Sequence, residues 1–148
     1  MTTLSTPIRA HPSRRSLATR LLIVGGVMQV VFALFHAGFP WSFDWNDQLA
    51  GLSGDNEATV WQMWAQGTYV LVVFAYLSFV HRHALLESRI GRAVAAAIAI
   101  FYFGRALTEA VFGDIATSGS VTLAVICVAV GLLYAVPLVL TQDRGGGR

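Results

Sequence analysis

The chain has 148 residues, of which 55% are hydrophobic and 12% are charged, and its formal net charge is +2. Soluble globular chains carry about 25% charged residues, so this composition excludes a soluble domain and indicates an integral membrane protein. All ten basic residues are arginines. Their placement suits membrane topology rather than phosphate binding, so no nucleic-acid partner is expected.

Four segments are long and apolar enough to cross a hydrocarbon core of about 30 Å, which takes about 20 residues of helix. They are residues 21–41, 60–80, 93–112 and 121–140. The connections between them are short, so we predict a single all-α domain over residues 21–140, an integral membrane four-helix bundle. Residues 1–20, which lack apolar periodicity, are expected to form a disordered cytoplasmic tail, and residues 141–148 a second tail.

The first connection is the longest. Its middle, residues 45–52, is expected to form a short interfacial turn or helix. Thr59 and Gln62 have the spacing of a capping box, and Asp55 and Asn56 are alternative caps. The second span is therefore predicted to begin in this region.

The next connection, residues 81–91, is short and polar, so the second and third spans are antiparallel neighbours. The third span opens with small residues four apart, Gly91, Ala95 and Ala99. Small residues let a neighbouring backbone approach closely. We interpret this stripe as packing within the chain, with a homo-oligomer contact as the alternative.

The distribution of charge sets the orientation of the spans. Arginines precede the first span, lie between the second and third spans, and follow the fourth, whereas the charged residues of the other two connections are all acidic. By the positive-inside rule both termini are cytoplasmic, which is an N-in/C-in topology. The four tryptophans lie at the opposite interface, where indole rings are favoured. Abundant Ala, Val, Gly and Arg suggest a bacterial source, so we expect a multi-pass protein of the bacterial inner membrane.

Arg105 is the only basic residue inside a predicted span, and Glu109 follows one helical turn later. A charge at bilayer depth costs about 2.5 to 3.5 kcal/mol on insertion scales, so such residues face protein or a wet cavity. The pair is therefore the first candidate for a functional site. The alternative is that the two charges only neutralise each other.

Other polar side chains reach the same level when depth is counted at about 1.5 Å per residue. His36 on the first span falls near the level of Glu109, and the spacing of Gln62, Gln66 and Tyr69 places them on one face of the second span. We therefore predict a polar pocket in the outer half of the bundle. Its ligand-binding candidates are Arg105, Gln66, Gln62, Tyr69 and the interfacial Trp64, and its acid–base candidates are Glu109 and His36.

Three functions remain open for such a pocket. The first is the binding of a small lipophilic or anionic ligand, lipid-like or quinone-like, by the guanidinium of Arg105. The second is an isomerase or cyclase that uses Glu109 and His36 for acid–base chemistry. The third is an accessory subunit whose charged pair contacts other helices of a larger membrane complex. The layer holds too few His, Cys or carboxylate side chains for a zinc or di-iron site, and no cofactor is assigned.

Two segments carry a resemblance to known proteins. Residues 35–41, Phe-His-Ala-Gly-Phe-Pro-Trp, place a polar side chain near the outer end of the first span, and residues 103–109, Phe-Gly-Arg-Ala-Leu-Thr-Glu, place an arginine late in the third. In these features the chain resembles the DoxX-like and other small bacterial four-helix membrane proteins. The resemblance covers the spans and implies the four-helix membrane fold, and no activity or site residue is carried over from it.

Overall fold

The computed structural model describes residues 12–113 and 117–142, and within these ranges all regular structure is helical. In chain order the elements are α1 (Pro12–Ala37), α2 (Phe39–Ser42), α3 (Trp45–Leu49), α4 (Gly54–Val80), α5 (Arg82–Glu87), α6 (Arg89–Phe112) and α7 (Ser118–Leu140). The prediction of an all-α chain is confirmed for this part of the protein.

Four helices, α1, α4, α6 and α7, are long and apolar enough to cross a membrane. In the apolar stretch of each, only 17% (α4) to 33% (α1) of the residues are buried within the chain. Exposed apolar surface is unfavourable in water by about 25 cal/mol per Å², and a bilayer removes that cost. The prediction of four helices that could span a membrane is confirmed, and these helices indicate a multi-pass membrane protein.

The first helix begins earlier than the first predicted span. Pro12 occupies the first position of α1, where a missing N–H removes no intrahelical bond. No glycine or proline interrupts the chain between Pro12 and residue 21, and Ala18 and Leu22 are fully buried. Residues 12–20 are thus helical, although a tail was expected up to residue 20.

Most residues of the two predicted tails lie outside the part of the chain that the structure describes. Residues 1–11 and 143–148, where disorder was predicted, lie outside the described residues. Of the C-terminal tail only Thr141 and Gln142 are described, and the Thr141 N–H still donates to the Pro137 carbonyl at 3.1 Å. The last turn of α7 therefore extends to the start of the predicted tail.

The first connection contains α2 and α3, and α3 confirms the short helix expected within residues 45–52. The next helix, α4, begins at Gly54. The Thr59 hydroxyl donates to the Asp55 carbonyl at 2.8 Å, one turn back in the same helix, so the capping box predicted at Thr59 does not form. Asp55 and Glu57 stabilise the earlier start because acidic residues in the first turn interact favourably with the helix dipole.

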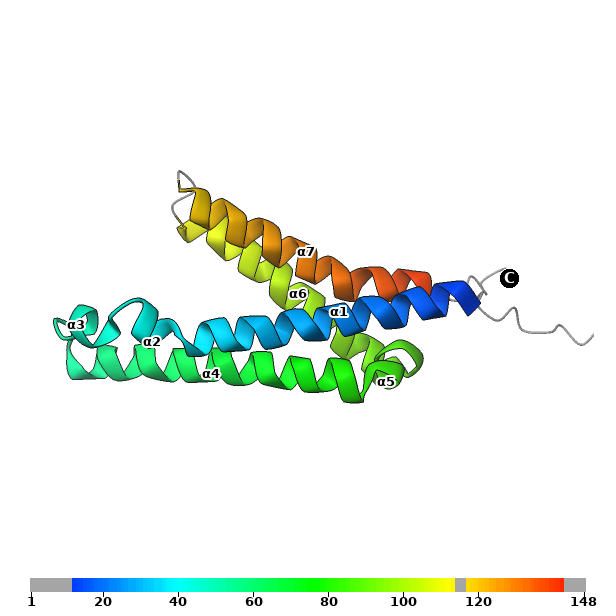
Figure 1. The fold of residues 1–148 in the computed structure, drawn as a ribbon, viewed down its shortest axis with the longest axis horizontal. Coiled ribbons are helices and arrows are strands. Elements are labelled where there is room, and N and C mark those ends of the chain that lie inside the picture. The colour runs from blue at the N-terminus through cyan, green and yellow to red at the C-terminus, as the bar shows by residue number, and fades with distance from the viewer. Residues whose placement is uncertain (1–11, 114–116, 143–148) are drawn as a thin grey trace, which may run out of the picture.

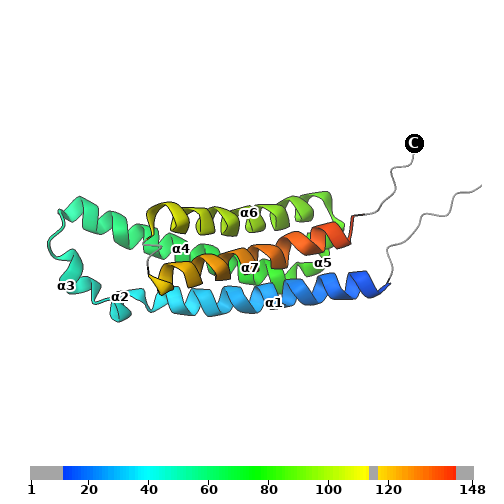
Figure 2. The same ribbon diagram turned by 90° about the horizontal axis from the view of Figure 1, so that it is seen from above.

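The four long helices form two pairs that lie in two layers. α1 packs against α4, α6 packs against α7, and contacts between α1 and α7 join the layers. One end of the molecule, which we call the terminal end, holds the start of α1, the end of α7 and α5, and the other, the loop end, holds α2 and α3 (Figure 1). The layers meet near the terminal end and diverge toward the loop end in this view. Figure 2 shows the long helices running along one common direction.

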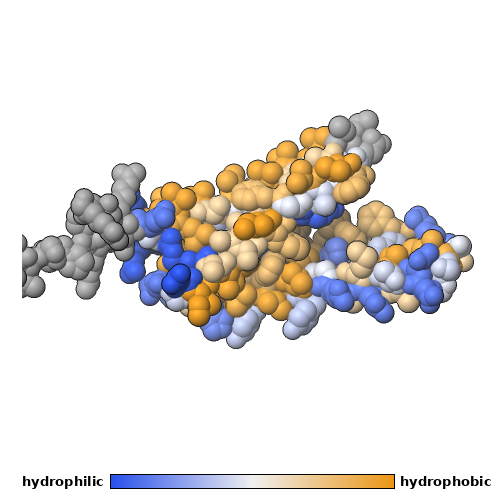
Figure 3. Space-filling view, turned by 180° about the vertical axis from the view of Figure 1, so that it is seen from behind, coloured by the Kyte–Doolittle hydropathy of each residue, from blue (hydrophilic) through white to orange (hydrophobic). Residues whose placement is uncertain are grey.

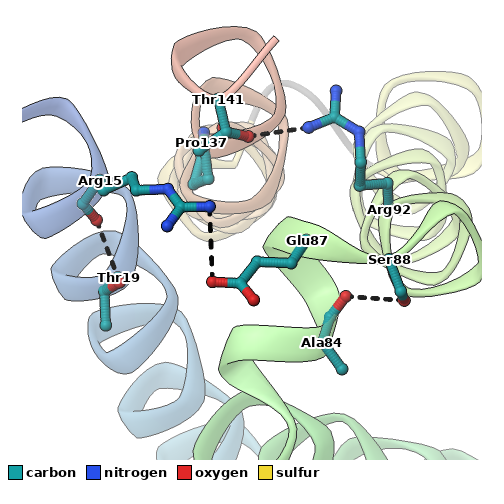
Figure 4. Close-up of polar contacts among 8 residues, drawn as sticks. All are labelled: Arg15, Thr19, Ala84, Glu87, Ser88, Arg92, Pro137 and Thr141. Carbon is teal, nitrogen blue, oxygen red and sulfur yellow. Dashed lines mark hydrogen bonds and ion pairs between the residues drawn. The ribbon is translucent and has the colours of Figure 1, made fainter. Parts of the chain in front are cut away.

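Helix α5 connects the two layers at the terminal end. It contacts α1, α4 and α6, and its Leu85 and Leu86 side chains are buried. Arg15 of α1 approaches Glu87 of α5 at 3.6 Å (Figure 4). Both side chains of this ion pair are more than half exposed, so apolar burial contributes more to the position of α5 than this ion pair does.

Arg92 of α6 caps the end of α7. Its guanidinium donates to the Thr141 hydroxyl at 2.8 Å, a contact seen in Figure 4, and to the Leu138 carbonyl at 3.0 Å. The last carbonyls of a helix have no intrahelical partner, and a cation near them is favourable. The bonds of Arg92 therefore satisfy the end of α7 and tie it to α6.

The small residues at the start of α6 pack inside the chain. Gly91, Ala95 and Ala99 are all buried, as predicted for packing within the chain. At Gly91 the backbone of α5 comes so close that a Cβ would overlap the carbonyl group of Ala84. Only glycine permits this approach of α5 to α6.

Replacing Gly91 with alanine is expected to destabilise the protein by about 1 to 3 kcal/mol, the usual cost of overpacking. Gly104 is the matched control because it lies in the same helix and a Cβ there meets nothing within 4 Å. Gly104→Ala should be neutral or stabilising, since alanine favours a helix over glycine by about 1 kcal/mol. Thermal unfolding in detergent, followed by circular dichroism, compares the two variants, and equal melting temperatures would contradict the close approach.

Candidate functional site

A cleft opens between the two layers toward the loop end. Figure 3 shows the surface hollowed between two arms, with a hydrophilic patch at the hollow and apolar surface around it. At its closed side, Phe74 of α4 and Phe101 of α6 make an edge-to-face contact with ring centroids 5.4 Å apart. We call the space between the layers beyond this contact the cleft. Arg105 lies one turn beyond Phe101 on the same face of α6, so it belongs to the cleft.

Arg105 and Glu109 form an ion pair at the cleft. Arg105 Nη1 and Glu109 Oε2 are 2.7 Å apart, and the hydroxyl of Ser120 in the first turn of α7 also bonds to the Glu109 carboxylate. The side chain of Glu109 is 13% exposed, whereas that of Arg105 is 43% exposed. The carboxylate is therefore held by two donors, and the Arg105 side chain stays partly accessible.

His36 belongs to the other layer, near the end of α1. Its carbonyl accepts a hydrogen bond from Trp64 Nε1 of α4 at 2.7 Å. Its ring rests on Gly67, where a Cβ would come within 2.9 Å of His36 Nε2. His36 is also close enough to Arg105 for the two to interact electrostatically. Among the predicted site residues, the structure thus pairs Arg105 with Glu109 on α6 and His36 with Trp64 in the other layer.

The other three predicted site residues lie on the outside of α4. All three are exposed, and the exposed fraction of Tyr69 is 69%: Gln62, Gln66 and Tyr69. They share one face of the helix, as their spacing predicts, but α4 packs on α1 with a different face that carries Leu71 and Ala75. The prediction counted only depth along the helix, and depth does not determine the direction in which a side chain points. The part of these three residues in ligand binding therefore stays a prediction.

The cleft is suited to holding an acceptor group. The exposed part of the Arg105 guanidinium offers a planar set of N–H donors, and apolar surface surrounds the hollow in Figure 3. A molecule with a carbonyl or anionic oxygen and an apolar remainder matches both features. Within residues 12–113 and 117–142, no three His, Cys, Asp or Glu side chains are grouped where they would hold a metal ion.

A second polar cluster lies deeper, on the terminal side of the cleft, and takes one side chain from each long helix. The Tyr102 hydroxyl donates to Gln29 Oε1 at 2.5 Å, and Gln29 Nε2 donates to the Tyr134 hydroxyl at 3.3 Å. The hydroxyls of Tyr134 and Ser78 are 2.6 Å apart. Since the Ser78 hydroxyl donates to the Phe74 carbonyl at 2.7 Å, Tyr134 is the donor to Ser78. The result is one directed chain of hydrogen bonds across both layers.

This cluster is fully enclosed. Gln29, Ser78 and Tyr134 are 0% exposed and Tyr102 is 2% exposed. Gly25 of α1 lies against the Tyr134 ring, where a Cβ would come within 2.9 Å of the ring carbons. The absence of a side chain at Gly25 therefore lets the tyrosine reach Gln29 from α7.

Sequence reasoning misses this cluster. Gln29 is the only amide in the first predicted span, and a buried amide in a membrane helix needs a hydrogen-bond partner on another helix. That signal was available in the sequence. The sequence does not identify the other members of the cluster, Tyr102, Tyr134 and Ser78. They stand among other aromatic and small residues, and periodicity alone does not distinguish them.

Comparison of the chain with protein-family models, with curated proteins and with solved structures finds no match. The resemblance to DoxX-like proteins therefore stays a prediction.

Tyr134→Phe, which removes the Tyr134 hydroxyl, is expected to lower the free energy of unfolding by about 1 to 3 kcal/mol, because Gln29 Nε2 loses its acceptor in a buried site. Tyr69→Phe is the matched control, since the exposed Tyr69 has no hydrogen-bond partner among the described residues. That variant should change the free energy by less than about 0.5 kcal/mol. Unfolding with sodium dodecyl sulfate from mild detergent measures both, and equal effects would show that the hydrogen-bond chain does not stabilise the fold.

Proposed function

We propose that this chain is an N-in/C-in four-helix bundle of the bacterial inner membrane that binds a small lipophilic molecule in the cleft through a carbonyl or anionic oxygen. The observation that carries the proposal is the exposure of Arg105, whose side chain is 43% exposed although it belongs to a candidate span. A guanidinium facing hydrocarbon is unfavourable. Its free N–H groups therefore need an acceptor that the described chain does not supply.

The geometry of the ion pair leaves room for that acceptor. A guanidinium has five N–H donors, and the contact of Arg105 with Glu109 is made through Nη1. The remaining donors lie in one plane and match a carbonyl or carboxylate oxygen. Arg105 and Glu109 also neutralise each other, so an uncharged carbonyl group, such as that of a quinone or a lipid ester, adds no net charge to the cleft.

Depth in the bilayer supports an amphiphilic ligand. Arg105 lies about 10 Å from the last residue of α6, and the four tryptophans belong to the neighbouring elements α2, α3 and α4 at the loop end. Tryptophan favours the membrane–water interface. A polar group bound to Arg105 therefore sits just below that interface, and the apolar part of the ligand extends into the same leaflet.

Binding fits the observed contacts better than turnover does. An acid–base role requires Glu109 to be free to exchange a proton with a substrate. In this structure its carboxylate is held by Arg105 at 2.7 Å and by the Ser120 hydroxyl, and only 13% of its side chain is exposed. We therefore assign Glu109 the role of positioning Arg105.

The proposed orientation rests on charge at the two ends. The described arginines outside the cleft lie at the terminal end, on α1, α5 and α6, whereas α3 and the first turn of α4 carry acidic residues. Cytoplasmic segments are enriched in arginine, which favours placing the terminal end in the cytoplasm. The same placement directs the cleft to the outer leaflet.

Single cysteines at Asp47 and Arg89, in a Cys127→Ala background, test this orientation because both positions are exposed. In intact spheroplasts a membrane-impermeant maleimide should label the Asp47→Cys variant, since α3 lies outside. It should label the Arg89→Cys variant only after permeabilisation. The opposite pattern would show that the termini lie outside and would place the cleft in the inner leaflet.

Quenching of tryptophan fluorescence measures ligand binding, because Trp64 bonds to His36 beside the cleft. An alkyl benzoquinone serves as the neutral probe and a brominated fatty acid as the anionic probe. Arg105→Gln should weaken the binding of at least one probe about tenfold or more, because it removes a charge-assisted hydrogen bond worth about 1.5 kcal/mol or more.

Arg89→Gln is the matched control for this measurement, since it removes an exposed arginine from the other end of the same helix. It should leave the affinity for both probes unchanged. If neither probe quenches saturably, or if Arg105→Gln and Arg89→Gln bind equally well, the proposed ligand site is wrong.

A further inference from the structure

The outward face of α4 carries a stripe of residues with the spacing of a helix–helix contact. Its members follow one another in alternating steps of four and three residues, and all but Val73 are exposed: Gln62, Gln66, Tyr69, Val73, Tyr76 and Val80. This is the spacing of the a and d positions in a left-handed coiled coil, which keeps one face of a helix toward its partner over several turns. We call these six residues the α4 seam.

The α4 seam faces away from the rest of the chain. α4 packs on α1 with Leu71, Ala75 and Ser78 buried, and Tyr69 precedes Leu71 by about 200° of helix rotation. Of the four candidate spans, α4 has the smallest buried share, 17%. In the part of the chain that the structure describes, Gln62, Gln66 and Tyr69 have no hydrogen-bond partner.

An amide without a partner is unfavourable at this depth. Gln66 lies about 21 Å from Val80 along α4, inside a hydrocarbon core of about 30 Å. Hydrocarbon offers no hydrogen bonds, so an exposed carboxamide there is stabilised by a partner from another helix. The seam therefore calls for a partner that supplies both donors and acceptors at the level of Gln66.

We propose that two copies of this chain associate through the α4 seam, with the two α4 helices parallel around a two-fold axis along the membrane normal. Such an axis places each residue opposite its own counterpart at the same depth. A carboxamide has two N–H donors and a carbonyl acceptor, so Gln66 pairs with Gln66 of the second copy. Tyr69 and Val73 continue the contact toward the middle of the bilayer.

The absence of charge on the seam favours a second copy over a different subunit. Symmetry brings a residue to its own counterpart, so a charged seam would repel itself, and none of the six seam residues is charged. Amides and tyrosines, by contrast, are self-complementary. The seam is also separate from the cleft, which lies between the layers, so association does not depend on the proposed ligand.

Cysteine crosslinking of the full chain in liposomes tests the interface, again in a Cys127→Ala background. Tyr69→Cys lies on the seam and leaves Gln66 intact. Met63→Cys is the matched control, because Met63 is on the same helix and is 67% exposed but lies off the seam. Mild oxidation should crosslink Tyr69→Cys to a covalent dimer with at least about a fivefold higher yield than Met63→Cys. Equal yields would overturn the proposal.

The role of the amide is tested by the dimer dissociation constant, measured by energy transfer between labelled copies diluted in lipid. Gln66→Leu should raise this constant about three- to tenfold, the usual range for an interhelical hydrogen bond in a membrane. Gln66→Asn should retain most of the affinity, and Gln48→Leu, on the exposed helix α3, should not change it. A chain that stays monomeric in lipid, or a dimer unaffected by Gln66→Leu, would show that lipid or another protein covers the seam.

Discussion

The hydrogen bonds from Tyr102 through Gln29 and Tyr134 to Ser78 take one side chain from each long helix, and the relative placement of the two layers depends on them. Hydrocarbon cannot replace a lost hydrogen bond as water does, so these buried groups hold their helices at one rotation and one depth. Apolar contacts between spans are less selective, because lipid is an equally good partner for them. Toward the loop end the charged contact of Arg105 with Glu109 lies within α6 instead of between layers, and there the layers are free to diverge.

The need of a polar group in hydrocarbon for a hydrogen-bond partner also distinguishes among the arginines and glutamines of the chain. Arg82 donates to the Phe79 carbonyl at 2.5 Å, and Arg92 donates to the Leu138 carbonyl at the end of α7, so both arginines satisfy carbonyls of helix ends at the terminal end of the molecule. Arg105 lies within a candidate span and has N–H donors beyond the one that contacts Glu109. Gln66 also lies within a candidate span, and its amide has no hydrogen-bond partner in the described chain. A polar group that is buried in lipid but not satisfied by its own chain indicates an external partner. We propose that this partner is a ligand in the cleft for Arg105 and a second copy of the chain for Gln66.

Much of the fold could be predicted because it follows from apolar length and residue size. The four spans are visible as runs of about 20 apolar residues, and the small residues Gly91, Ala95 and Ala99 indicate a close contact that the structure contains. The boundaries of the helices are harder to predict from the sequence. α1 starts at Pro12 because packing of Ala18 and Leu22 extends the helix past the apolar run, and packing between distant helices leaves no local signal.

For the candidate site, the sequence by itself determined which polar residues lie in the apolar helices and how far along each helix they stand, because both follow from counting along a helix. That was enough to single out Arg105, Glu109 and His36 and to place Gln66 near the same level. Only the tertiary structure decided which way each side chain points, because helix rotation is set by contacts between residues far apart in the chain. It turned Arg105 toward the cleft, turned Gln66 outward, and enclosed Gln29 with hydrogen-bond partners from two other helices, Tyr102 and Tyr134.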